Sequence, residues 1–208
     1  MVELRAHAEP AGDLVAAYAL PTCDDVLYMP GFIDDAGEVE AQLMTELDWR
    51  EESILMFGKR VKVPRLCAWC GDPGVIYRYS HTTHLAEGWP SPVRALRDRL
   101  RARLAIEFNF ALANLYRDGN DAMGWHADDE RELGDAPCIA SLSFGAPRRF
   151  DLRARDGTPR RVSLVLEPGS LLLMWGVSQR RWQHALPRTK QTLGARVNLT
   201  FRRVGAST

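Results

Sequence analysis

Apolar residues recur at helical spacing in two stretches of the N-terminal half of the chain. Residues 34–47 carry an apolar residue at every fourth position, and this spacing predicts an amphipathic helix. A second stretch begins at Pro92, a residue that favours the first turn of a helix, and its arginines occupy the face opposite the apolar stripe. The stripes consist of Val39, Leu43 and Leu47 in the first helix and Val93, Leu96, Leu100 and Leu104 in the second.

From residue 108 onward the pattern changes to short runs that alternate in polarity or are uniformly apolar, as is typical of strands. Turn signals such as Pro168-Gly169 and Arg155-Asp156-Gly157 separate them. The expected strands are 108–116, 138–144, 149–153, 160–167, 170–175 and 195–204. Two helices followed by these strands predict an α+β fold, in which helices back an antiparallel double sheet whose mouth can hold a metal. Residues 53–91 lack a clear period and are interpreted as a substrate-facing loop or ribbon.

Composition narrows the class of protein. The chain is 46% hydrophobic and 26% charged, which is typical of a globular protein with a sizeable core. No apolar run reaches the ~18 residues of a membrane span, and the N-terminus lacks the basic start and apolar centre of a secretory signal, so we expect a cytoplasmic protein. The formal net charge is zero, so any binding of nucleic acid has to rest on local basic runs such as 59–65 or Arg180-Arg181.

The four cysteines are too few and too irregularly spaced for a disulfide framework. Cys67 and Cys70 have CxxC spacing, but a redox pair would need a helix after the motif, and residues 71–74 predict a turn. A structural zinc would need two further ligands, for which His81 and His84 are the nearby candidates. We interpret all four as unpaired, reduced thiols.

His126 and Asp128 are two positions apart, so in extended backbone their side chains point to the same side and can converge on one metal ion. The spacing has little weight alone, because His7 and Glu9 share it. His184 follows several further strands and can supply a third ligand. Two histidines and one carboxylate leave three coordination positions open, the arrangement of non-haem iron(II) oxygenases.

The last expected strand carries polar side chains at alternate positions, namely Arg196, Asn198, Thr200 and Arg202. Alternate residues of a strand share one face. Two arginines on a face turned into a dry core would be costly, whereas guanidinium groups match carboxylates well. This face therefore predicts a site for a small dianion beside the metal.

Several motifs occur together and in order: Asn114-Leu-Tyr116, residues 124–130 (GWHADDE), residues 139–145 (IASLSFG) and residues 196–202 (RVNLTFR). In this combination, over about residues 53–204, the chain resembles the AlkB family of iron(II)/2-oxoglutarate-dependent dioxygenases, and most closely the animal homologues that repair DNA. The resemblance implies a double-stranded β-helix (jelly-roll) core. Trp125 and Ala127 depart from the more polar residues common at these positions.

The resemblance also implies residue roles. His126, Asp128 and His184 match the iron(II) ligands and catalytic centre, and Arg196 matches a position that holds 2-oxoglutarate, for which we expect the C5 carboxylate as its partner. The other positions that match 2-oxoglutarate contacts are Asn114, Tyr116, Thr200 and Arg202. The positions that match substrate contacts are the duplex-inserting hairpin Met56, Phe57 and Gly58, together with Arg65, the base-stacking segment Tyr77 and Tyr79, and the acidic pair Asp129 and Glu130.

On this basis we expect an N-terminal extension with a helix over 1–50, a nucleotide-recognition lid over 51–95 and a dioxygenase core over 96–208, all within one structural domain. The implied activity is oxidative demethylation of 1-methyladenine and 3-methylcytosine in DNA, or alternatively RNA, by a monomer that uses iron(II), 2-oxoglutarate and oxygen. Two other hypotheses remain open. One is an oxygenase acting on RNA, protein or a small molecule, and the other is a nucleic-acid-binding sandwich that has lost its metal.

Overall fold

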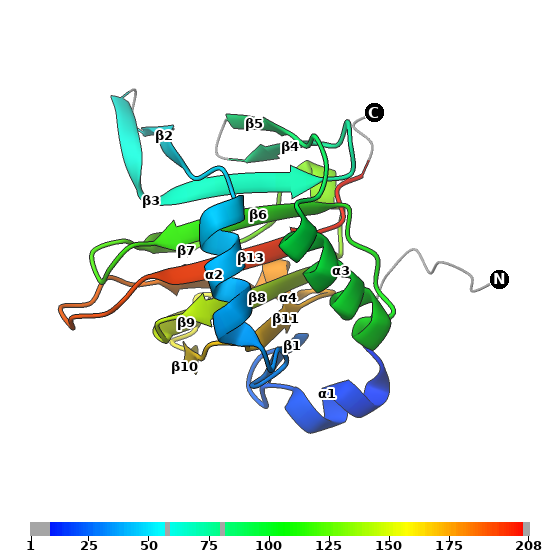
Figure 1. Cartoon of the computed structure of the whole chain (residues 1–208). Coiled ribbons are helices and arrows are strands. Elements are labelled where there is room, and N and C mark those ends of the chain that lie inside the picture. The colour runs from blue at the N-terminus through cyan, green and yellow to red at the C-terminus, as the bar shows by residue number, and fades with distance from the viewer. Residues whose placement is uncertain (1–8, 57–58, 80–81, 206–208) are drawn as a thin grey trace.

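Two antiparallel sheets face each other in the computed structural model, which describes residues 9–56, 59–79 and 82–205 (Figure 1). The large sheet has the order β1-β11-β8-β13-β6-β3-β2, and the small sheet has the order β10-β9-β12-β7. A separate hairpin pairs β4 with β5. This arrangement confirms the α+β double-sheet fold expected from the sequence.

The bounds of the elements are as follows. The large sheet consists of β1 (Val26–Met29), β2 (Arg50–Met56), β3 (Lys59–Gly71), β6 (Phe110–Tyr116), β8 (Ile139–Gly145), β11 (Leu171–Met174) and β13 (Arg196–Arg202). The small sheet consists of β7 (Met123–His126), β9 (Arg148–Ala154), β10 (Arg161–Leu166) and β12 (Trp182–Leu186), and the hairpin of β4 (Ile76–Tyr79) and β5 (Thr82–Leu85). The helices are α1 (Gly12–Tyr18), α2 (Ala36–Glu46), α3 (Ser91–Leu104), α4 (Ser178–Arg181) and the 3-10 turn η1 (Arg131–Leu133).

The central strands of the large sheet are buried on both faces, because helices cover one face and the small sheet covers the other. Figure 1 shows α2 and α3 lying across the first of these faces. In β6, Ala111, Ala113 and Leu115 pack into the core beneath the helices, whereas Phe110 and Leu112 pack into the core between the sheets. Alternation along a strand thus divides the core into two layers, and the second layer surrounds the candidate site.

The two predicted helices correspond to α2 and α3, and each of the six predicted strands has its counterpart in β6, β8, β9, β10, β11 or β13. The strands that sequence analysis left out are β1, β7 and β12, and the segment 53–91, expected as a loop or ribbon, contains most of β2 and all of β3, β4 and β5. β7 and β12 are short and carry polar side chains at the positions that form the site, so neither shows a clean alternation of polarity.

The three segments expected along the chain (1–50, 51–95 and 96–208) all contribute strands to the large sheet. Residues 26–29 form its edge strand β1, and residues 50–71 form β2 and β3 at its opposite edge. The helix α3 crosses the boundary expected at residue 95. The lid segment is therefore continuous with the core sheet through the pairing of β3 with β6. None of the described helices is long and apolar enough to cross a membrane.

All four cysteines are buried, and none of them is joined in a disulfide. Cys67 and Cys70 lie three positions apart on β3, so their side chains leave the strand on opposite faces. His84, one of the two histidines considered as zinc ligands, instead places its Nε2 2.7 Å from Glu52 Oε1. His81 lies outside the described residues.

Burial raises the pKa of the Cys67 and Cys70 thiols to about 12. We therefore expect both thiols to resist iodoacetamide at pH 8 in the native protein, because the thiolate is the reactive form. Mass spectrometry should detect alkylation of all four cysteines after denaturation. Rapid labelling of Cys67 or Cys70 in the native protein would contradict this account of the CxxC motif.

Candidate metal and co-substrate site

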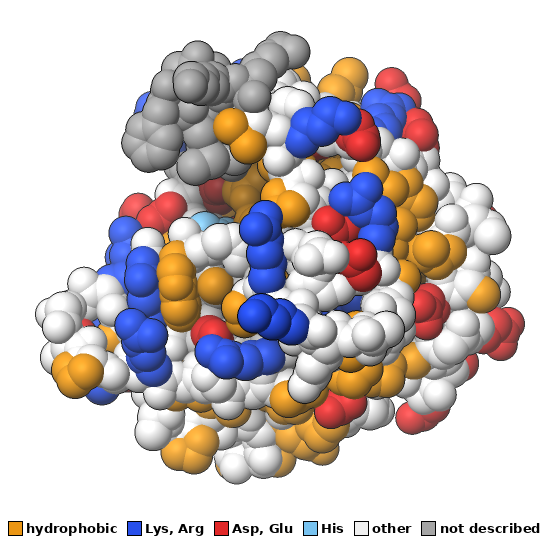
Figure 2. All heavy atoms as spheres, turned by 90° about the vertical axis from the view of Figure 1, so that its left-hand side faces the viewer, with side chains coloured by type: hydrophobic (Ala, Val, Ile, Leu, Met, Phe, Trp, Pro, Cys, Tyr) orange, Lys and Arg blue, Asp and Glu red, His pale blue; other side chains and the backbone are white. Residues whose placement is uncertain are grey.

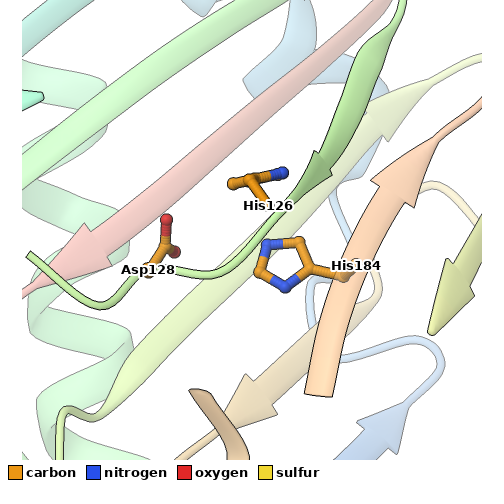
Figure 3. Close-up of side chains that lie close together, drawn as sticks. All are labelled: His126, Asp128 and His184. Atoms are coloured by element: carbon orange, nitrogen blue, oxygen red, sulfur yellow. The ribbon is translucent and has the colours of Figure 1, made fainter. Parts of the chain in front are cut away.

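Three side chains, two from the small sheet and one from the loop that follows β7, converge on one point (Figure 3). His126 ends β7, Asp128 follows it in the adjoining loop, and His184 lies in the middle of β12. β7 and β12 are antiparallel neighbours in which His184 is the direct partner of His126. The potential ligand atoms of the three residues lie within 4.8 Å of one another. Strand pairing brings the distant third ligand predicted from the sequence to the first two.

The donor atoms are in the chemical form that a divalent metal requires. His126 Nδ1 lies 2.9 Å from the carbonyl oxygen of Gly124, so Nδ1 carries the proton and Nε2 keeps its lone pair. Burial lowers the pKa of both imidazoles, that of His184 to about 3, and keeps them neutral. Burial opposes the charge of Asp128, but favourable electrostatic interactions, the largest of them with the Arg202 guanidinium, lower the pKa of this carboxyl overall.

Two atoms of this group are buried without a hydrogen-bond partner among the described residues, namely Asp128 Oδ1 and His184 Nδ1. A buried carboxylate oxygen without a partner is costly, and coordination of a cation removes that cost. The set of two imidazoles and one carboxylate fits iron(II) or a similar divalent ion. These residues therefore fit the metal that the sequence predicts.

Arg202 stands beside the metal ligands on β13. Its Nη2 donates to Asp128 Oδ2 at 3.0 Å, and its Nη1 donates to the backbone oxygen of Thr200 at 3.2 Å. Burial lowers the pKa of this guanidinium, but Asp128, Tyr77 and Glu130 together raise it above its ordinary value. Arg202 is therefore charged, and its charge is compensated by a metal ligand.

Arg196 lies at the other end of the same strand face and has no such compensation. Its Nη2 donates to Ser143 Oγ at 2.9 Å, and its guanidinium stacks over the ring of Tyr116 at 5.3 Å. Its Nε has no partner, and no carboxylate pairs with it in the described part of the chain. Burial lowers its pKa to about 10, so the side chain remains charged at neutral pH. A buried, uncompensated cation with free donors predicts an anionic ligand.

A single pocket between the two sheets joins the triad to the arginine face. All residues expected to hold 2-oxoglutarate line it, namely Asn114, Tyr116, Arg196, Thr200 and Arg202. Asn198 also lines it, and its Nδ2 donates to Ser141 Oγ at 2.8 Å and to Leu142 O at 3.0 Å. The apolar side of the pocket consists of Leu112, Met123, Phe150, Leu166, Met174 and Leu186.

The residues expected to contact the base lie at different depths. Tyr79 lines the pocket, whereas Tyr77 is 0% exposed and packs against Phe110 at a ring distance of 5.1 Å. The expected stacking role of Tyr77 therefore needs correction, because core side chains cover its ring. Its hydroxyl instead donates to Glu130 Oε2 at 2.9 Å. Burial, with a contribution from Asp128, raises the pKa of Glu130 to about 7.

The other expected substrate residues are also distributed unevenly. Asp129 forms an ion pair of 2.7 Å with Arg155 at the surface and is absent from the pocket lining. Arg65 is buried and contacts one of the residues expected to hold 2-oxoglutarate, since its Nε donates to Asn114 Oδ1 at 2.7 Å. Met56 ends β2, and its backbone pairs with Lys59, whereas Phe57 and Gly58 lie outside the described residues.

Several residues of the pocket and its supports were not predicted from the sequence. Ser141 and Ser143 alternate within the otherwise apolar β8 and face β13, a polar pattern that could have identified them. Met123 and Phe150 left no signal, because apolar side chains in short strands are equally typical of core. Gln179 lies next to Arg180-Arg181, which the sequence offered only as a basic run, and nothing in the sequence marked Gln179 itself.

Comparison with known proteins places the chain among iron-dependent oxygenases. The family model described as the 2OG-Fe(II) oxygenase superfamily matches residues 25–202. The human protein named alpha-ketoglutarate-dependent dioxygenase alkB homolog 3 is 37% identical over 190 residues, covering 86% of this chain and 66% of the relative. The mouse protein named DNA oxidative demethylase ALKBH2 is 44% identical over 158 residues, covering 73% of this chain and 66% of the relative. The chain thus spans just under two thirds of these two relatives.

A solved structure titled as that of OsALKBH1 has the same fold, with a TM-score of 0.57 at 18% sequence identity. The match covers 86% of this chain and 96% of the other. Together with the two facing sheets, this likeness confirms the jelly-roll fold expected from the sequence.

Manganese(II), used as a redox-inert substitute for iron(II), should raise the melting temperature of the protein. A ligand present at 100 times its Kd adds about 2.7 kcal/mol to the free energy of unfolding. His126→Ala should abolish this shift because it removes a ligand. His7→Ala, which removes the histidine of the other H-x-[DE] motif, should leave the shift intact. Equal shifts in both variants, measured by differential scanning fluorimetry, would contradict the assignment of the triad.

Proposed function

The chain belongs to the 2OG-Fe(II) oxygenase superfamily, and from this premise we propose that it is an iron(II)/2-oxoglutarate-dependent demethylase that repairs N-alkylated bases in DNA. The observation that carries the proposal is the shared pocket, in which the metal triad and the uncompensated Arg196 face the same space. The relatives that are named DNA oxidative demethylase support the choice of substrate.

His126, Asp128 and His184 would hold the metal. When bound, iron(II) together with 2-oxoglutarate and oxygen supplies the oxidant that hydroxylates an N-methyl group, after which formaldehyde leaves and the base is restored. The protein contributes geometry and exclusion of water. The buried positions of Asp128 and His184 support that role.

The two arginines would divide the charge of 2-oxoglutarate. Arg196 would bind the remote C5 carboxylate, because its charge is uncompensated and Tyr116 and Ser143 hold its guanidinium in place. Arg202 is already paired with Asp128 and would orient this ligand and neutralise charge close to the metal. Asn114 and Thr200, on the same pocket wall, offer polar contacts between these two ends.

Recognition of the base would combine stacking with charge. Tyr79 lines the pocket and can stack on an extruded base, a contact worth about 1–3 kcal/mol. Glu130 is held by the Tyr77 hydroxyl near the pocket, and a carboxylate in a region of low dielectric favours cationic 1-methyladenine and 3-methylcytosine over neutral bases. Damaged bases that cannot pair also cost less to extrude from the duplex.

Local basic side chains would hold the phosphate backbone, since the net charge of the chain is zero. Lys62, Arg117 and Arg188 line a groove between β3 and the loops that follow β6 and β12. Lys62 also pairs with Glu51 in this groove, and Arg117 pairs with Asp121. Arg188 forms no ion pair with an acidic side chain of the described residues. Figure 2 shows this side of the molecule, with lysine and arginine side chains spread around a hollow in which a histidine is visible. This distribution favours nucleic acid over a small molecule as the substrate.

The purified protein should release formaldehyde from an oligonucleotide that contains 3-methylcytosine, in the presence of iron(II) and 2-oxoglutarate. Single-stranded DNA, duplex DNA and RNA of the same sequence should be compared, and His184→Ala serves as the inactive control. Consumption of 2-oxoglutarate without formaldehyde release from any methylated oligonucleotide would overturn the proposed substrate but not the family.

Arg196→Met should raise the KM for 2-oxoglutarate by about 10–100-fold, because a hydrogen bond to a charged group contributes about 1.5–3 kcal/mol. The melting temperature of the ligand-free variant should be unchanged or higher, since the substitution removes a buried, unpaired charge. Release of carbon dioxide from labelled 2-oxoglutarate measures the KM, with the exposed Arg161→Met as the matched control. An unchanged KM would assign the C5 carboxylate to another residue.

A further inference from the structure

Gln179 is a buried polar residue of α4, only 1% exposed, and both ends of its side-chain amide have partners. Its Oε1 accepts a hydrogen bond from the backbone N–H of Asp128 at 2.9 Å. Its Nε2 donates to Met174 Sδ at 3.4 Å. A buried amide is costly unless its groups are paired. Movement of Asp128 away from Gln179 would break this hydrogen bond, so the two residues hold each other in place.

The backbone of Asp128 depends on this contact. Asp128 lies in the loop beyond β7, where no strand partner takes up its N–H. A buried N–H needs an acceptor, and the Gln179 side chain supplies it. Arg202 holds one carboxylate oxygen of the same residue, which leaves Oδ1 as the oxygen that can face the metal. The backbone N–H and the carboxylate of Asp128 are thus held by two different elements, α4 and β13.

The short helix α4 also leads directly into β12, which carries the ligand His184. Its start is anchored by Asp25, whose Oδ2 accepts a hydrogen bond from Val177 N at 2.8 Å. Gln179 is therefore attached to a fixed segment rather than to a free loop. Gln179 thus links the segment that leads into β12, which carries His184, to the loop that carries Asp128.

A second, weaker link runs in parallel at the surface. Arg155 Nη1 donates to the backbone oxygen of Gln179 at 2.8 Å and to Asp129 Oδ2 at 2.7 Å. Asp129 is half exposed, so solvent screens this ion pair and reduces its contribution. The buried contact of the Gln179 side chain therefore dominates the link.

We propose that Gln179 is a positioning residue that couples α4 to Asp128 and thereby sets the separation of the metal ligands Asp128 and His184. The proposal rests on the metal site of the proposed function and adds to it a residue that touches neither metal nor co-substrate. Groups that orient metal ligands typically change metal affinity by about 10–100-fold when they are removed.

The test measures the Kd for manganese(II) alone, from the electron paramagnetic resonance signal of the free ion, so that catalysis is not involved. Gln179→Met keeps the size of the side chain but removes the acceptor and should weaken binding by about tenfold or more. Gln179→Asn shortens the amide and should weaken binding in the same direction. Gln179→Glu retains an acceptor oxygen and should keep most of the affinity.

The matched control is Gln183→Met, one position before His184. The amide oxygen of Gln183 accepts a hydrogen bond from Arg153 rather than from Asp128. This variant should bind manganese(II) like the wild type. Wild-type affinity in both Gln179→Met and Gln179→Asn, or a loss in Gln179→Glu as large as in Gln179→Met, would overturn the role of Gln179. Absence of manganese(II) binding by the wild-type protein would instead overturn the metal site itself.

Discussion

Two guanidinium groups are buried between the sheets on one face of β13, and the rest of the site is arranged around their charge. Arg202 is compensated by Asp128 in a pair whose side chains are only 4% and 2% exposed. Such a pair tolerates burial only when its geometry is good, and loss of one partner typically costs about 3–5 kcal/mol. Arg196 has no anionic partner among the described residues, and its charge requires one from outside the protein.

The carboxylate of Asp128 links these charges to the metal. One oxygen is held by Arg202, and the other is left without a partner beside two neutral imidazoles. A cation at this position would take up Asp128 Oδ1, and a dianion against Arg196 would take up the unpaired Nε of that guanidinium. The pocket is thus suited to metal and 2-oxoglutarate together better than to either alone.

The scaffold explains how this arrangement keeps its shape. β13 is the middle strand of the large sheet, paired on both sides with β6 and β8, so the arginine face is fixed by two ladders of hydrogen bonds. The histidines come from two short strands of the small sheet that are direct neighbours. Asp128 alone among the ligands lies outside a strand, and side chains from β13 and α4 hold it in place.

The sequence predicted the strands that have strong polarity patterns. It also predicted that the polar residues of 196–202 share one face of a strand, because alternate side chains of a strand point to the same side. It also predicted the triad. The spacing of His126 and Asp128 was weak evidence by itself, and His184 and the two arginines made a metal site the better interpretation. It could not separate Tyr77 from Tyr79, because both share a strand face and only the packing of Phe110 decides which ring is covered. Nor could it find Gln179, whose role depends on a contact with a residue 51 positions away.

The proposed function requires that one pocket hold a metal on His126, Asp128 and His184 and a dianion on Arg196. A crystal structure of the protein with manganese(II) and 2-oxoglutarate tests it most directly. We expect the metal on these three side chains, with Asp128 Oδ1 as the coordinating oxygen and the C5 carboxylate on the Arg196 guanidinium. A metal bound elsewhere, or a C5 carboxylate that leaves Arg196 without an anion, would contradict it.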